Sequence, residues 1–168
     1  MNAGLLLIRL VVGLLMAAHG AQKLLGWLGG YGLAGTAAFF DELGFRPGRL
    51  FATAASLSEV GGGVLVALGL FGPVGPALMV SVMVVAAISV HWPNGLFAMT
   101  NGIEIPLLYA TAAAALALTG PGAYSLDAVL GLASVWTPAL TWASLAVAIV
   151  AAIGNLAIRR PAPVRVAV

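Results

Sequence analysis

The chain has 168 residues, of which 62% are hydrophobic and only 7% are charged, with seven Lys/Arg and five Asp/Glu. Soluble domains carry about 25% charged residues, so this composition excludes a soluble enzyme, a nucleic-acid-binding protein and a disordered linker. The chain has no cysteine, which excludes thiol catalysis, disulfides and thiolate-bound metals. We therefore expect an all-α integral membrane protein, with residues 1–168 forming one membrane domain.

Five apolar stretches approach the roughly 20 residues that a helix needs to cross a bilayer. In chain order they are residues 4–25, 50–70, 74–92, 103–119 and 138–158. Their Val and Ile residues do not predict strands, because open sheet edges are not tolerated in lipid. Residues 33–45 place phenylalanines beside two acidic residues, which predicts a short helix at the membrane surface rather than a span. The predicted architecture is a bundle of four transmembrane helices within residues 4–130. Residues 131–168 add a fifth C-terminal transmembrane helix and a short tail.

The basic residues of the predicted loops gather on one side of the membrane. They are Lys23, Arg46, Arg49, Arg159, Arg160 and Arg165. The opposite side has none, and Arg9 lies inside the first span. Because short cytoplasmic loops are rich in Lys and Arg, we expect the N-terminus outside the cell and the C-terminus in the cytoplasm.

Two charged residues at membrane depth form a candidate pair. Ionisable side chains in this position are costly and usually face the interior of a bundle. Arg9 lies in the outer half of the first span, and Glu59 lies near the middle of the antiparallel second span. Counting residues places Glu59 between the depths of Arg9 and His19, within reach of either. One interpretation is a structural Arg9–Glu59 ion pair that joins two helices, and the other is a polar site or proton path.

Polar side chains from four spans are predicted to meet at the cytoplasmic end of the bundle. The candidates for ligand binding or proton handling are His19, Lys23, Glu59, His91, Asn94 and Glu104. We expect a pocket that opens at the cytoplasmic interface, narrows toward Glu59 and accepts a ring-sized ligand. A quinone head group or a small polar solute would suit its histidines and lysine, while the alternative is a purely structural cap at the helix ends. The spacing of these residues matches no metal motif, so no metal site is expected.

The same segments resemble the DoxX family. Residues 19–24, His-Gly-Ala-Gln-Lys-Leu, resemble its HGxxKL signature, and residues 59–63, 90–95, 104–108 and 120–127 follow in the family's order. The resemblance covers about residues 5–130 and implies a bacterial or archaeal inner-membrane protein with a four-helix core. The helix predicted within residues 131–168 lies outside that core.

The resemblance also implies a function. Family members are associated with membrane oxidoreductase assemblies, including the related DoxD subunit of thiosulfate:quinone oxidoreductases, and with oxidative-stress responses. Three functions stay open: a membrane subunit or partner of a quinone-linked redox assembly, a small-molecule or proton transporter using Arg9, Glu59 and His19, or a structural assembly protein without catalysis. The expected partners are the lipid bilayer, a soluble or membrane oxidoreductase and further copies of the chain. A formal charge of +2 gives no reason to expect nucleic acid.

Overall fold

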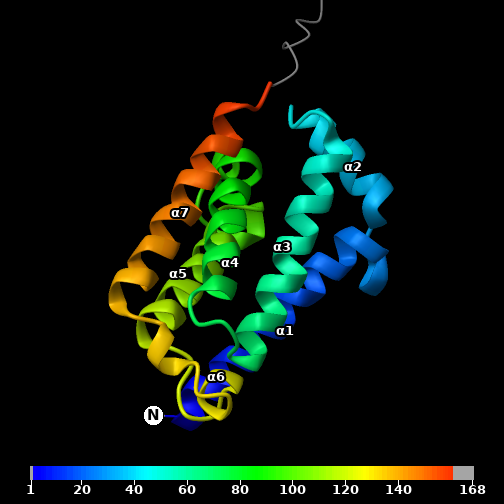
Figure 1. Ribbon diagram of the computed structural model, residues 1–168. Coiled ribbons are helices and arrows are strands. Elements are labelled where there is room, and N and C mark those ends of the chain that lie inside the picture. The colour runs from blue at the N-terminus through cyan, green and yellow to red at the C-terminus, as the bar shows by residue number, and fades with distance from the viewer. Residues whose placement is uncertain (1, 161–168) are drawn as a thin grey trace, which may run out of the picture.

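The computed structural model describes residues 2–160, and every regular element in that range is helical (Figure 1). The α-helices are α1 Asn2–Leu25, α2 Gly32–Glu42, α3 Gly48–Leu68, α4 Val74–Ala86, α5 Glu104–Thr119, α6 Leu126–Val129 and α7 Pro138–Ala157. Short helical turns connect them: η1 Trp27–Gly29, η2 Ala87–His91, η3 Trp92–Asn94, η4 Ala98–Thr100 and η5 Ala133–Val135. The prediction of an all-α protein is confirmed.

Within residues 2–160, four helical segments are long and apolar enough to cross a membrane. They are α1, α3, α7 and the continuous run Val74–Asn94, in which η2 and η3 extend α4. Helix α5 is shorter, with 16 residues, which corresponds to about 24 Å along its axis. The span predicted at residues 103–119, and with it the total of five spans, therefore stays a prediction. Residues 33–45 do contain a short helix, α2, as expected.

The helices α3 and α4 lie at the centre of the contacts. Helix α1 packs along α3, α3 also contacts α2 and α4, and α4 contacts α5 and α7. Figure 1 shows the N-terminus at one end of the molecule and the C-terminal end of α7 at the other. The core between these helices is apolar; its largest fully buried residues include Met16 of α1 and Met79 of α4, and Leu145 of α7 joins them.

Glycines bring α1 and α3 into backbone contact. A Cβ atom on Gly20 would lie 2.7 Å from the carbonyl oxygen of Ser56, and one on Gly13 would lie 2.7 Å from the backbone nitrogen of Ala67. Small residues at such interfaces let two helix backbones approach closely in a membrane. These contacts fix which residues of α1 lie beside which residues of α3.

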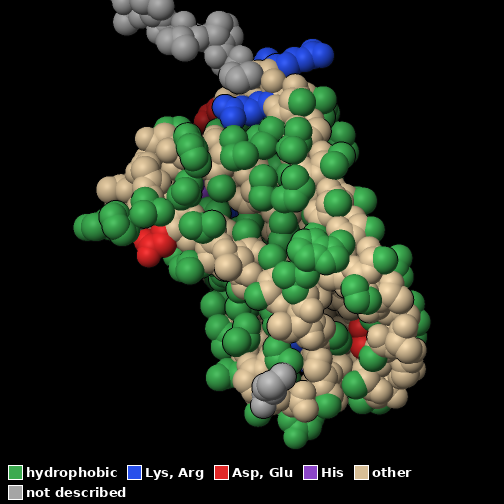
Figure 2. All heavy atoms as spheres, turned by 90° about the vertical axis from the view of Figure 1, so that its left-hand side faces the viewer, with side chains coloured by type: hydrophobic (Ala, Val, Ile, Leu, Met, Phe, Trp, Pro, Cys, Tyr) green, Lys and Arg blue, Asp and Glu red, His purple; other side chains and the backbone are tan. Residues whose placement is uncertain are grey.

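The surface is apolar and the interior contains charge. Figure 2 shows a face with many hydrophobic side chains and with Lys and Arg side chains gathered at one end of the molecule. Leu7 of α1 is 64% exposed and Val150 of α7 is 69% exposed, whereas Arg9, Glu59 and Asp127 are buried. Together with the long apolar helices, this pattern is typical of a multi-pass membrane protein.

Candidate functional site

A cavity of about 920 Å³ lies between the C-terminal end of α1, α2, α3, the C-terminal half of α4 with η2, and the last turns of α7. Its volume is within the range of small-molecule sites, roughly 300–1,000 Å³. Its aromatic lining is Tyr31, Phe39, Phe40, Phe45 and Phe51. Its polar lining is Gln22, Lys23, Thr36, Glu42, Ser58, Glu59, Ser81, Ser89, His91 and Asn155.

Lys23 and Glu59 form an ion pair in the wall of this cavity. The ammonium of Lys23 donates to Oε1 of Glu59, and this is the one salt bridge among residues 2–160. The side chain of Glu59 is 0% exposed and that of Lys23 is 33% exposed. Oε2 of Glu59 is buried and has no hydrogen-bond partner. A buried polar atom without a partner is costly, so this oxygen is ready to accept a bond from a further donor.

The local fold positions Lys23 for this pair. Gly20 of α1 lies against Ser56 and Val60 of α3, one turn before Lys23. Side chains of a helix lean toward its N-terminus, so the long side chain of Lys23 turns back toward Glu59. Thr36 of α2 donates to the carbonyl oxygen of Lys23 at 3.1 Å, which ties α2 to the end of α1.

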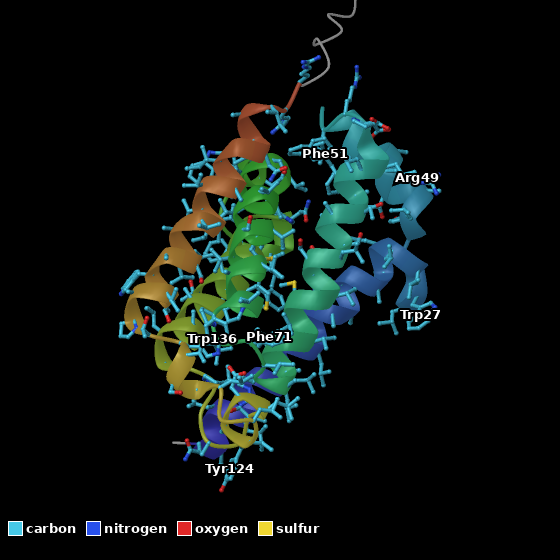
Figure 3. All side chains as sticks on the ribbon, in the orientation of Figure 1. Trp27, Arg49, Phe51, Phe71, Tyr124 and Trp136 are labelled. Atoms are coloured by element: carbon cyan, nitrogen blue, oxygen red, sulfur yellow. The ribbon has the colours of Figure 1, made fainter. Side chains whose placement is uncertain are left out.

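The C-terminal end of α7 is bound to the corner between α2 and α3. Arg159 Nε donates to the carbonyl oxygen of Leu43 at 2.7 Å, and the backbone nitrogen of Arg160 donates to the carbonyl oxygen of Gly44 at 2.8 Å. The guanidinium of Arg159 also lies 6.0 Å from the ring centre of Phe45. Figure 3 labels Phe51 near this end of the molecule, and its ring lies 5.6 Å from that of Phe45. The rings of Phe45 and Phe51 and the end of α7 thus form the wall of the cavity on this side.

The end of α4 supplies the cavity wall opposite α2. Ala87–His91 form a π-helical turn, a wide turn frequently found at functional sites. The imidazole Nδ1 of His91 lies 2.8 Å from the carbonyl oxygen of Asn101. Asn94 Nδ2 donates to the same oxygen at 3.3 Å. The loop that follows α4 therefore holds the histidine ring in one orientation.

The structure places three of the six candidate site residues in the cavity lining and the other three elsewhere. Lys23, Glu59 and His91 line the cavity. His19 is exposed, and its ring makes an edge-to-face contact with Tyr109 of α5 at 5.8 Å. Asn94 and Glu104 stabilise the loop between α4 and α5, where Glu104 Oε2 accepts from the backbone nitrogen of Ala98 at 2.7 Å. The structure therefore does not bring all six residues into one shared pocket.

The expected ion pair between Arg9 and Glu59 is wrong. Arg9 instead donates to the carbonyl oxygens of Val66 at 3.1 Å, Ala67 at 3.0 Å and Tyr124 at 2.9 Å, and also to that of Pro121. The close contacts of Gly13 place Arg9, one turn earlier in α1, beside the last turn of α3. Glu59 lies about two turns of α3, or roughly 12 Å, away from Ala67.

Some important residues were not singled out by the sequence. Asp127 is fully buried, and its two carboxylate oxygens accept from the backbone nitrogens of Phe71 at 2.9 Å and Gly72 at 2.7 Å. It therefore fixes the turn between α3 and α4. Ser89 and Asn155 line the cavity. The one signal for Asn155 is an amide near the end of the mostly apolar final span.

Comparison with known protein families gives one match. The sequence model described as DoxX matches residues 4–92, which run from α1 to the first residue of η3 and contain Lys23, Glu59 and His91. Comparison with curated proteins and with solved structures gives no match.

Proposed function

Because the chain belongs to the DoxX family, we propose that it is the membrane subunit or partner of a quinone-linked redox assembly and binds a quinone head group in the cavity beside Lys23 and Glu59. The observation that carries this proposal is an ion pair whose buried carboxylate keeps one oxygen without a partner, in the wall of an aromatic cavity of about 920 Å³.

The residues of the cavity fit such a ring. Lys23 has three N–H donors and uses one on Glu59, so its ammonium can donate to an oxygen on the ring. The partly buried rings of Phe40 and Phe51 in the cavity lining offer faces and edges for aromatic contact. A bound quinone supplies the electron-carrying chemistry. The protein contributes binding, orientation and exclusion of water, and we assign these residues a binding role.

The location of the cavity supports a partner on the cytoplasmic side. Arg46, Arg49, Arg159 and Arg160 lie at the same end of the bundle as the cavity, whereas the N-terminus lies at the other end (Figure 1). Applied to the described residues, the preference of basic residues for the cytoplasm orients the N-terminus outward in a bacterial or archaeal cell membrane. Arg165 lies outside the described residues. A soluble or membrane oxidoreductase would then meet the protein at this end.

The transport hypothesis has less support. It required Arg9, Glu59 and His19 to act as one set, but Arg9 binds backbone oxygens at the far end of α3, and His19 packs against Tyr109. The structural interpretation fits Arg9 and Asp127, whose partners are all backbone groups.

A binding experiment that compares the original chain with a variant whose cavity is partly filled by a larger side chain tests the proposal. The full chain is placed in lipid nanodiscs and titrated with a short-chain ubiquinone by calorimetry. We expect Ala55→Phe, which adds a ring to the cavity wall, to weaken binding at least about tenfold, a change of roughly 1.4 kcal/mol. Ala146→Phe on the exposed face of α7 is the matched control and should bind like the original protein. Equal affinities for Ala55→Phe and the original chain, or no binding by either, would overturn the proposal.

A further inference from the structure

This inference rests on the proposed function and concerns the chemical form of the ring. We infer that the cavity selects a ring that carries hydroxyl groups, the reduced form of such a ligand, over a ring whose oxygens are carbonyls or ethers. The reason is that Glu59 and His91, in the wall of the cavity, present hydrogen-bond acceptors that a carbonyl or ether oxygen of a ligand cannot satisfy.

Glu59 is the strongest of these acceptors. In its ion pair with Lys23 the carboxylate is ionised, so both of its oxygens accept hydrogen bonds and neither donates. Oε1 is used by Lys23 and Oε2 is buried without a partner. A ligand hydroxyl would give Oε2 a charge-assisted hydrogen bond. A ligand carbonyl in the same place could not donate, so Oε2 and the carbonyl oxygen would face each other without a hydrogen between them.

His91 provides a second acceptor. A carbonyl oxygen can only accept, so the imidazole Nδ1 must donate to Asn101. In the neutral ring this leaves Nε2 without a proton and able to accept. Asn94 donates to the same carbonyl oxygen and keeps the loop in place, so the tautomer is set by the fold.

Three further lining side chains follow the same pattern. Ser89 donates to the carbonyl oxygen of Val85 at 2.6 Å, Asn155 Nδ2 to that of Ala151 at 2.9 Å and Gln22 Nε2 to that of Leu28 at 3.1 Å. In each case the side-chain oxygen remains as an acceptor, and the amides of Asn155 and Gln22 each keep one further N–H. Lys23 is the charged donor of the cavity wall. A ligand that matches this set donates through more than one hydroxyl and accepts one bond from Lys23.

Three probes with the same ring separate these forms: tetramethylhydroquinone, tetramethyl-1,4-benzoquinone and the dimethyl ether of the hydroquinone. Each is titrated anaerobically into the full chain in nanodiscs. We expect the hydroquinone to bind at least about tenfold more tightly than the other two, since a hydrogen bond to a charged group is worth roughly that factor. Binding of the quinone or the ether as tightly as the hydroquinone would overturn the inference.

Two variants test the named acceptors. In Glu59→Gln the amide oxygen can keep the bond to Lys23 while the amide N–H₂ takes the place of Oε2, so the preference for the hydroquinone should fall to about twofold or reverse. In His91→Asn the amide can keep the bond to Asn101 but Nε2 is lost, so the preference should fall several-fold. His19→Asn, which lies outside the cavity lining, is the control and should keep the preference. Thermal melting of each variant establishes that it is folded, and full preference in a folded Glu59→Gln would contradict the role of Oε2.

The outcomes distinguish the two proposals. If all three probes bind equally and Ala55→Phe weakens all of them, the ring site stands and the selectivity is wrong. If none of the probes binds to the original chain, the proposed function itself fails.

Discussion

Gly13 of α1 and Gly63 of α3 face each other so closely that a Cβ atom on Gly13 would lie 2.6 Å from the carbonyl oxygen of Gly63, and one on Gly63 would lie 2.5 Å from that of Gly13. No side chain fits between the two backbones at this level. The contact sets the offset between the helices, which puts Arg9 beside the end of α3 and Lys23 within reach of Glu59.

Two of the three consecutive glycines of α3, Gly61 and Gly63, should therefore respond differently to alanine. Gly63→Ala forces the α1 and α3 backbones apart, and overpacking of this kind costs roughly 1–3 kcal/mol of unfolding free energy. Gly61→Ala meets nothing within 4 Å and should be neutral or stabilising, because alanine favours a helix over glycine by up to about 1 kcal/mol. Denaturant or thermal unfolding in a mild detergent measures both. Equal loss of stability in the two variants would contradict the backbone contact.

Double-mutant cycles should find coupling between Lys23 and Glu59 but not between Arg9 and Glu59. Lys23→Met leaves the buried carboxylate of Glu59 without its partner, which we expect to cost roughly 3 kcal/mol. Adding Glu59→Leu should recover much of that loss. Arg9→Leu and Glu59→Leu share no partner in the structure, so their effects should add to within about 0.5 kcal/mol. The unfolding free energies of the single and double variants measure both couplings. A large coupling between Arg9 and Glu59 would contradict the structure, in which these two residues are not paired.

Asp127→Asn should destabilise the turn between α3 and α4. The carboxylate accepts from two backbone nitrogens, whereas an asparagine offers one oxygen and places an N–H₂ group against the second N–H. We expect a loss of roughly 1–3 kcal/mol for the unsatisfied buried group. Asp41→Asn is the matched control: Asp41 accepts one bond, from the backbone nitrogen of Gly48, and asparagine can keep it. A similar loss in both variants would show that the two-oxygen contact is not the cause.

The orientation of the chain can be measured by cysteine labelling, because the sequence has no cysteine of its own. Ser134→Cys lies in η5, at the end of the bundle that contains the N-terminus, and Glu42→Cys lies at the end of α2, near the arginines. Both positions are exposed. A membrane-impermeant maleimide should label Ser134→Cys in intact cells and Glu42→Cys only after the membrane is permeabilised. The reverse pattern would place the cavity at the outer face.

Hydrophobic length predicted the helices well. The stretch 138–158 corresponds to α7, Pro138–Ala157, and the stretch 50–70 corresponds to α3, Gly48–Leu68. These boundaries follow from proline, glycine and polar residues at the ends of apolar runs, which are local features of the sequence.

The pairing of polar side chains could not be predicted in the same way. Counting residues from the ends of two spans gives the relative depths of their side chains only if the two helices are not shifted along each other. Here the contacts of Gly13 and Gly20 with α3 impose such a shift. His19 and Lys23 are four residues apart, and residues with this spacing are neighbours on a helix. In the structure the long side chain of Lys23 reaches the carboxylate of Glu59, whereas the imidazole of His19 contacts Tyr109. Such choices depend on tertiary packing, which a single sequence does not contain.

The attachment of α7 to the corner between α2 and α3 has a consequence for family diversity. The segment matched by the family ends at residue 92 and already contains the charged pair, yet Ala151 and Asn155 of α7 form part of the cavity wall. In the proposed binding site, the segment matched by the family would supply the charged pair that recognises a ligand, and α7 would limit the size of that ligand. Exchanging the segment after residue 92 between family members would therefore change the size range of accepted ligands while leaving their hydrogen-bonding requirements intact.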